Sequence, residues 1–222
     1  MRNIPTFRII CKTIYPYLFL TCVFLLWSGT AFSQTTSSAA ETRTVTDQST
    51  NEKWSGHFNY SLGYKKMEAN WFPAEDQFEY GLVDLDFQKA RWPVSIACQL
   101  LMAYAEQIPD TEGASGDYSG TYEFNLGLRK IWRPQKKIQP FLGGGLSILG
   151  ASTTEQGCGY CYAQTDHDSS LGYWVGTGAY WILGQNFHTG FNLQYTYGEI
   201  QLFGKDFNAG GWHFNALIGY HW

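Results

Sequence analysis

The chain has 222 residues, of which 44% are hydrophobic, 18% aromatic and only 15% charged. Its slightly negative mean hydropathy excludes a polytopic helical membrane protein, which needs several apolar runs of about 20 residues. The apolar content excludes disorder for most of the chain, and a net charge of −4 gives no reason to expect a nucleic-acid partner. A β-rich, aromatic and Gly-rich single domain remains.

Residues 1–33 are predicted to be a secretory signal peptide. They have a basic start, an apolar core and a small-residue cleavage site, formed in order by Arg2, Arg8 and Lys12, by residues 14–27, and by Ala31 and Ser33. A retained membrane anchor is the alternative. Cleavage would remove three positive charges and no negative one, which leaves an exported, acidic protein.

The next stretch, residues 34–53, is rich in Ser, Thr, Glu and Gln and has no aromatic residue. This composition predicts a disordered periplasmic segment ahead of the folded domain. A linker to a further domain is the alternative.

From residue 54 to residue 222, apolar and polar residues alternate with the period of two that is typical of strands. Eight strands are expected, at residues 54–64, 78–88, 94–104, 121–132, 138–149, 171–182, 187–197 and 211–222. Each has one apolar face opposite a face of Gly, amide and a few charged residues, and Trp, Tyr and Phe cap the apolar surface at its ends. The sequence therefore predicts an all-β fold, an eight-stranded antiparallel transmembrane β-barrel.

The connectors between these segments alternate in length. Short connectors are expected at residues 89–93, 133–137 and 183–186, and long ones at 65–77, 105–120, 150–170 and 198–209. A soluble sandwich or lipocalin-like barrel would also alternate, but short periplasmic turns and long outer loops favour an outer-membrane barrel. The even number of strands places both termini in the periplasm.

This pattern over residues 54–222 resembles the small eight-stranded outer-membrane barrels of Gram-negative bacteria, the OmpA, OmpX and OmpW type. The end of the chain is similar to the C-terminal signature that such proteins present to the barrel-assembly machinery, formed here by Phe214, Ile218, Tyr220 and Trp222. The resemblance implies a location in the outer membrane. It concerns architecture, so no family active site is carried over.

Two cysteines, Cys158 and Cys161, lie in the longest connector beside Asp166, His167 and Asp168. Because thiols outside the inner membrane are oxidised, we expect a small disulfide-closed loop. A metal site formed by both thiolates and His167 is the alternative.

No recognisable hydrolase constellation is present. Five histidines are available in the chain, and His167 is close in sequence to Ser169 and Ser170, but adjacency along a loop does not orient a catalytic triad. We therefore expect no enzyme activity, no catalytic residue, no cofactor and no metal.

The strand faces that point inward carry the remaining candidate site. They are expected to form a polar network in the lumen, made of Asp84, Asp86, Glu123, Arg129, His57, His188 and His221. Isolated buried charges are costly, so Arg129 should pair with Asp86 or Glu123 and close the lumen. The three histidines should lie near the periplasmic mouth. A proton- or metal-responsive lumen is the alternative.

The expected function is a non-enzymatic envelope barrel with a structural or surface-interaction role through its four long loops. The alternatives are a small passive conduit for apolar molecules, like OmpW, and then a lipid A-modifying enzyme. We expect a monomer that contacts outer-membrane lipid and lipopolysaccharide and meets the barrel-assembly machinery during insertion. The short turns are rich in Lys and Arg and the long loops in Asp and Glu, so acidic loops could hold divalent cations against lipopolysaccharide phosphates.

Overall fold

A computed structural model describes residues 53–68, 75–107, 117–132, 136–156 and 163–222. The expected signal peptide, nearly all of the segment 34–53, and both Cys158 and Cys161 lie outside the described residues. The expectations for them remain predictions.

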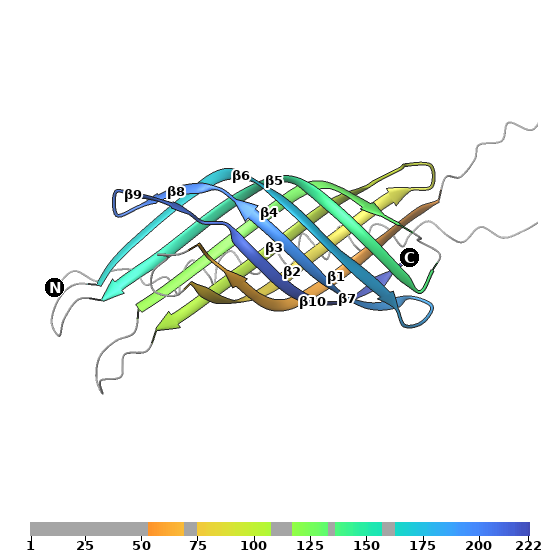
Figure 1. The fold of residues 1–222 in the computed structure, drawn as a ribbon, viewed down its shortest axis with the longest axis horizontal. Coiled ribbons are helices and arrows are strands. Elements are labelled where there is room, and N and C mark those ends of the chain that lie inside the picture. Colours follow the sequence, from red (N-terminus) through yellow and green to blue (C-terminus); the bar gives the residue numbers. More distant parts are fainter. Residues whose placement is uncertain (1–52, 69–74, 108–116, 133–135, 157–162) are drawn as a thin grey trace, which may run out of the picture. The chain divides into compact units, whose positions relative to one another are not determined.

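Eight antiparallel strands close into a barrel in the order β1-β10-β7-β6-β5-β4-β3-β2, so β1 pairs with both β2 and β10 (Figure 1). Their bounds are β1 Trp54–Lys66, β2 Asp76–Lys89, β3 Ser95–Gln107, β4 Asp117–Ile131, β5 Ile138–Gln156, β6 Ala163–Ile182, β7 Phe187–Tyr197 and β10 Gly211–His221. The predicted fold class is confirmed. Within the described residues, no helix is long and apolar enough to span a membrane.

The connectors differ from expectation in two places. The expected loop 150–170 is largely strand, because β5 and β6 stay paired up to Gln156 opposite Ala163. The expected loop 198–209 contains a hairpin of β8 (Glu199–Leu202) and β9 (Lys205–Asn208). The outer parts of β5 and β6 carry polar residues on both faces, so they lack the apolar alternation by which the other strands were predicted.

The β8–β9 hairpin turns at Phe203 and Gly204, whose φ angles are 50° and 73°. Two consecutive positive φ values are typical of the two-residue hairpin turn whose twist matches the flanking strands. Glycine adopts this conformation freely, whereas Phe203 needs compensating contacts.

A β-bulge changes which residues of β2 face the lumen. Asn59 of β1 lies opposite Asp84, but Ser61 lies opposite Gly81, so the register shifts between them. On the side of the bulge toward the short turns, the even-numbered residues Asp84 and Asp86 are buried and point inward. On the other side, the inward residues are odd-numbered, such as Glu79. The bulge explains why the alternation in the first half of this strand is hard to follow in the sequence.

The outer face of the barrel is an apolar belt. Its middle consists of exposed side chains such as Leu146, Phe191 and Ile218, which are 61%, 59% and 64% exposed. Exposed tryptophans border the belt at the end with the short turns, namely Trp54, Trp132, Trp181 and Trp222. Exposed aromatic residues border it at the other end, including Tyr64, Tyr104, Tyr173 and Trp212. Cys98 is half-buried, on the outward parity of β3.

Among the residues that the structure describes, the inside of the barrel is mainly polar, with two small apolar clusters. One, at the end with the long connectors, comprises Met67, Leu149, Ala151, Ile200, Leu202 and Ala209. The other, near the short turns, comprises Phe141, Tyr180 and Leu217. Between them, a Cβ added to Gly143 would lie 3.0 Å from the Trp174 ring, so this glycine gives the inward indole its space.

Candidate functional site

Two layers of buried charged residues cross the lumen at different heights. The lower layer, toward the short turns, contains Asp84, Asp86, Arg129, His57 and Tyr180. The upper layer, toward the long connectors, contains Lys65, Glu79, Glu123 and His213. All of these side chains are buried, with exposures between 0% and 9%.

Strand register assembles the lower layer from strands that are distant in sequence. His57 of β1 lies directly opposite Asp86 of β2 on one side and His221 of β10 on the other. Arg129 enters from β4 and Tyr180 from β6, on the facing wall of the barrel. Alternation puts all of these side chains on the inner face.

Arg129 is the centre of the lower layer. Its Nη1 lies 3.0 Å from Asp84 Oδ1 and 3.0 Å from Asp86 Oδ2, and it also donates to the Tyr180 hydroxyl. The Tyr180 hydroxyl donates to Asp86 Oδ2 at 2.9 Å, and the guanidinium carbon lies 4.7 Å from the centre of the Phe141 ring. One cation therefore binds two carboxylates of β2, and Tyr180 extends this network to β6 on the opposite side of the barrel.

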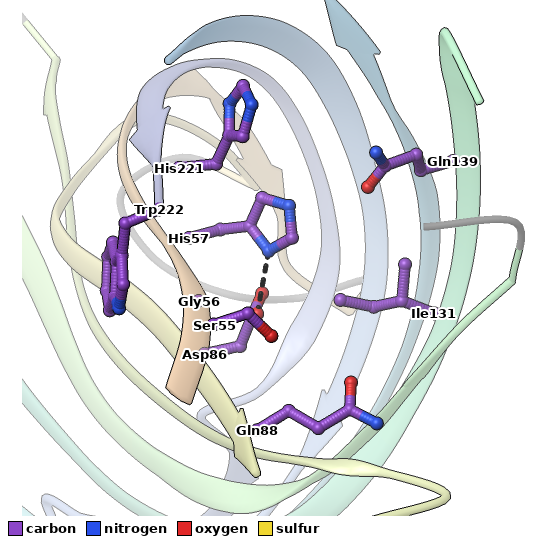
Figure 2. A pocket seen from close by; sticks show the side chains of 9 residues that line it. All are labelled: Ser55, Gly56, His57, Asp86, Gln88, Ile131, Gln139, His221 and Trp222. Carbon is purple, nitrogen blue, oxygen red and sulfur yellow. Dashed lines mark hydrogen bonds and ion pairs between the residues drawn. The ribbon is translucent and has the colours of Figure 1, made fainter. Parts of the chain in front are cut away.

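Three histidines gather beneath this ion pair. The Nδ1 of His57 donates to Asp86 Oδ1 at 2.9 Å, and its ring stacks on Tyr180 with centroids 4.5 Å apart. The His188 ring lies 5.1 Å from that of His57, and the His221 ring 6.0 Å from it. Beside them is a cavity of about 90 Å³ at the mouth with the short turns, lined by Ser55, Gly56, His57, Asp86, Gln88, Ile131, Gln139, His221 and Trp222 (Figure 2).

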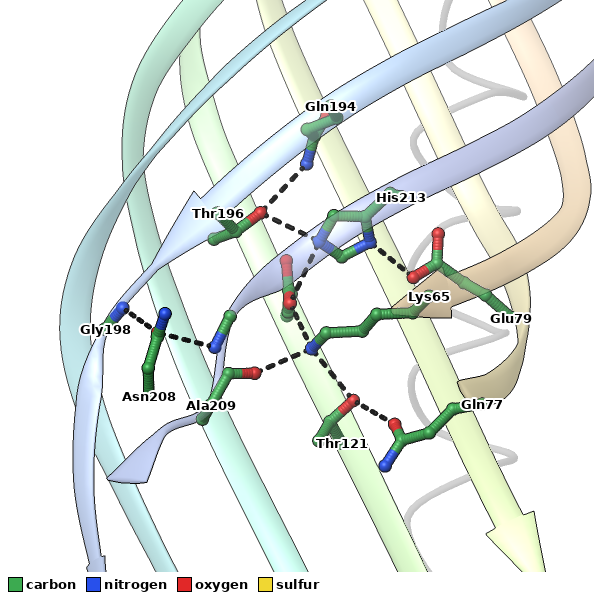
Figure 3. Close-up of polar contacts among 12 residues, drawn as sticks. Lys65, Gln77, Glu79, Thr121, Gln194, Thr196, Gly198, Asn208, Ala209 and His213 are labelled. Carbon is green, nitrogen blue, oxygen red and sulfur yellow. Dashed lines mark hydrogen bonds and ion pairs between the residues drawn. The ribbon is translucent and has the colours of Figure 1, made fainter. Parts of the chain in front are cut away.

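The upper layer is built around Lys65 (Figure 3). Its ammonium group donates to Glu123 Oε1 at 2.6 Å, to Thr121 Oγ1 at 3.1 Å and to the backbone carbonyl of Ala209 at 2.7 Å. Since Ala209 follows β9, this contact ties the base of the β8–β9 hairpin to the lumen. The three bonds use all three donors of the ammonium group.

His213 completes the upper layer. Its Nδ1 lies 2.5 Å from Glu79 Oε2, and its Nε2 lies 3.0 Å from Thr196 Oγ1 and 3.4 Å from Glu123 Oε1. Glu79 also accepts a hydrogen bond from Asn215 Nδ2. The imidazole thus bridges both carboxylates of this layer.

The β8–β9 hairpin is fixed above the upper layer by contacts with β6. Asp166 Oδ2 accepts from the backbone N–H of Phe203 at 2.6 Å, and Asp168 Oδ2 accepts from that of Gln201 at 2.7 Å. Such charge-assisted hydrogen bonds are stronger than neutral ones. They hold the residue with positive φ at the hairpin tip.

The Thr196, His213 and Glu79 side chains form a row that resembles a nucleophile, a base and an orienting acid. Each of the three residues is 0 % exposed. A substrate would have to displace the upper layer to reach the hydroxyl. The row therefore acts as a buried hydrogen-bond network.

The structure brings most of the inward residues chosen from the sequence into these layers, but in a different pairing. Arg129 contacts Asp86, as one expected alternative had it, and also Asp84. Glu123 is not its partner, because Glu123 binds Lys65 in the upper layer. The choice between the two carboxylates depends on how the strands tilt around the barrel, which alternation along one strand does not reveal.

Several site residues were missed in the sequence. Lys65 was assigned to a connector, although it has the same parity as the inward His57 and Asn59. Tyr180 has the parity of the inward glycines of β6, so the alternation contained a signal for it. Glu79 had no clear signal, since the β2 bulge reverses the parity there.

A closed barrel of eight antiparallel strands, with an apolar outer belt and a polar, ion-paired lumen, is the architecture of the small outer-membrane β-barrel proteins. Two solved structures share it. Neisserial surface protein A is 14% identical over 75% of this chain and 96% of its own, with a TM-score of 0.55. A major outer membrane protein from Thermus thermophilus is 11% identical over 76% of this chain and 99% of its own, with a TM-score of 0.54.

No family model matches the chain. No curated protein sequence matches it either. At these identities the structural likeness shows the fold, and the role of the chain has to be argued from its own residues.

Proposed function

We propose that this chain is a non-enzymatic outer-membrane barrel with a sealed lumen, which presents a rigid β-structured surface outside the cell. The observation that carries the proposal is the pair of charged layers. Each links strands that are not neighbours in the barrel through one cation, with Arg129 joining β4 to β2 below and Lys65 joining β1 to β4 above. An eight-stranded barrel is just wide enough for side chains to fill, so two such layers leave no continuous path for ions.

The apolar belt supports the location in the membrane. It consists of aliphatic residues bordered by aromatic ones, as expected for strands that face lipid chains between two interfaces. The outward positions of the C-terminal strand, Phe214, Ile218, Tyr220 and Trp222, are all exposed on this belt. That exposure is compatible with recognition of these residues by the barrel-assembly machinery during insertion.

The part of the barrel that would project outside is the extension of β5 and β6 together with the β8–β9 hairpin. The carboxylates of Asp166 and Asp168 clamp the hairpin to β6, and Lys65 clamps its base. The hairpin tip, including Gly204, Lys205 and Asp206, is exposed. A fixed, exposed edge of this kind suits contact with a surface partner or with lipopolysaccharide.

A passive conduit for apolar molecules is the second candidate. The observation that favours it is the apolar cluster at the upper end of the lumen, where Ile200 and Leu202 of the hairpin pack with Met67 and Leu149. Movement of the hairpin would expose this cluster. Uptake of an apolar dye into vesicles that contain the protein would support the conduit, and its absence supports the sealed barrel.

Site-specific labelling tests the location and the orientation. A cysteine is introduced at Lys205 in the hairpin or at Lys137 in a short turn, and intact cells are treated with a membrane-impermeant maleimide. We expect the protein in the outer-membrane fraction. The variant with a cysteine at position 205 should be labelled more strongly than the unmodified chain, and the variant with a cysteine at position 137 should be labelled no more than the unmodified chain. Labelling at 137 but not at 205 would reverse the orientation, and recovery in another fraction would overturn the location.

A further inference from the structure

The lower mouth of the barrel contains a compact group of three imidazoles. His57 comes from β1, His188 from β7 and His221 from β10, and the register places all three at the same end. The ring centroids are 5.1 Å apart for His57 and His188, 6.0 Å for His57 and His221, and 5.6 Å for His188 and His221. Each ring therefore neighbours both of the others.

The hydrogen bonds leave one nitrogen of each ring available. Asn59 Nδ2 donates to the backbone carbonyl of Asp84 at 3.3 Å, so Asn59 Oδ1 faces His188 and accepts from its Nε2 at 2.5 Å. The Nδ1 of the fully buried His188 has no hydrogen-bond partner, and neither has the Nδ1 of His221. Because the Nδ1 of His57 donates to Asp86, the lone pair of a neutral His57 ring is on Nε2.

The spacing of the rings suits a metal ion. With metal–nitrogen bonds of about 2.0–2.1 Å, three imidazoles around a tetrahedral ion have ring centroids roughly 5 Å apart. The contact of His57 with Asp86 is the carboxylate–histidine arrangement that orients metal ligands and increases their basicity. The adjoining cavity of about 90 Å³ leaves room for a water molecule as a further ligand (Figure 2).

Charge also favours a cation at this place. Asp84 and Asp86 together carry two negative charges, and Arg129 compensates one of them. The imidazole cluster therefore adjoins a net negative charge. Lys65, the cation of the other layer, is bound to Glu123.

We propose that His57, His188 and His221 form a binding site for a divalent transition-metal ion that prefers imidazole nitrogen, such as Cu²⁺, Zn²⁺ or Ni²⁺. In the described part of the chain, no three His, Cys, Asp or Glu side chains are already arranged to hold a metal ion. Binding therefore requires the His221 side chain to reorient until its Nδ1 converges with Nδ1 of His188 and Nε2 of His57, which keep their hydrogen bonds to Asn59 and Asp86. The cavity, which His221 lines, gives this side chain space to move.

Copper binding to the full-length, untagged protein in detergent micelles tests the site. The probe is Cu²⁺ alone, followed by calorimetric titration and by electron paramagnetic resonance. We expect one tightly bound ion whose spectrum shows coupling to several imidazole nitrogens. His188→Gln and His221→Gln should each weaken binding by at least tenfold and reduce that coupling.

His167→Gln is the matched control, because His167 lies exposed on β6, away from the cluster. Its binding should equal that of the unmodified chain, and a double Cys158→Ser, Cys161→Ser variant should also be unaffected. Heat-modifiable migration on gels establishes that each variant is folded. If His188→Gln does not fold, His221→Gln still tests the site, because His221 is only half-buried at the mouth of the barrel. Absence of tight binding, or equal binding by the folded His221→Gln variant, would overturn the proposal, as would loss of binding in either control.

Discussion

The two charged layers contain the same kinds of groups but lie in different surroundings. Each has two carboxylates, one Lys or Arg side chain and one histidine in contact with a carboxylate. The lower layer adjoins a cavity and the half-buried His221, whereas the upper layer lies near an apolar cluster and its His213 is fully buried. The lower layer can therefore belong to a site that exchanges with solvent, whereas the upper layer stabilises the closed barrel.

The difference should appear first in the cost of removing each cation. Lys65→Met would leave Glu79 and Glu123 buried with only His213 to compensate them. We expect the free energy of unfolding, measured by urea titration in lipid vesicles, to fall by about 3–5 kcal/mol, the usual cost of breaking a buried pair. The double variant Lys65→Met, Glu123→Gln should recover much of this loss. If Lys65→Met left the free energy of unfolding unchanged, the upper layer would not stabilise the barrel.

Removing the lower cation should cost less. Arg129→Met leaves Asp84 and Asp86 unpaired, but the neighbouring cavity lets water reach them, so we expect a loss of about 3 kcal/mol, at the lower end of the range for a buried pair. The same urea titration measures it, with Arg129→Met, Asp84→Asn as the compensating control. A loss clearly larger than that of Lys65→Met would contradict the comparison.

A smaller effect is expected from the histidine of the upper layer. His213→Gln removes the contact with Glu79, although Asn215 still donates to that carboxylate. We expect a loss of about 1–3 kcal/mol in the free energy of unfolding, the cost of leaving one buried acceptor without its partner. His167→Gln, on the exposed part of β6, should change stability by no more than about 0.5 kcal/mol. Equal effects of the two substitutions would remove His213 from the layer.

The smallest effect should be local to the hairpin. Asp166→Asn weakens the hydrogen bond that holds the N–H of Phe203, which we expect to cost about 1 kcal/mol. Hydrogen exchange should speed up severalfold in residues 199–208 and stay unchanged in the barrel strands. Faster exchange throughout the barrel would mean that the hairpin is not a separate unit.

The same contrast explains what could be predicted from the sequence. The strands in the belt were predictable, because lipid on one side and a polar lumen on the other impose strict alternation. The outer parts of β5 and β6 have polar surroundings on both sides, and their alternation disappears. Strand parity alone identifies inward residues such as Asp86 and Arg129.

The pairing of charged residues within the lumen was harder to predict from the sequence. It depends on strand tilt and on the bulge in β2, neither of which leaves a pattern in a single strand. Thus Arg129 lies inside the barrel, and its second partner is Asp84 and not Glu123. Lys65 was missed only because the first strand was predicted to end at residue 64, whereas β1 continues to Lys66. The geometry of the three histidines, likewise, needed the register between β1, β7 and β10.

Planar-bilayer recording tests most directly the central claim that the two layers seal the lumen. The unmodified protein should show no steady single-channel conductance at neutral pH, whereas Arg129→Met and Lys65→Met should each increase the frequency of openings. Steady conductance of the unmodified protein, unchanged by either substitution, would show an open pore and contradict the account.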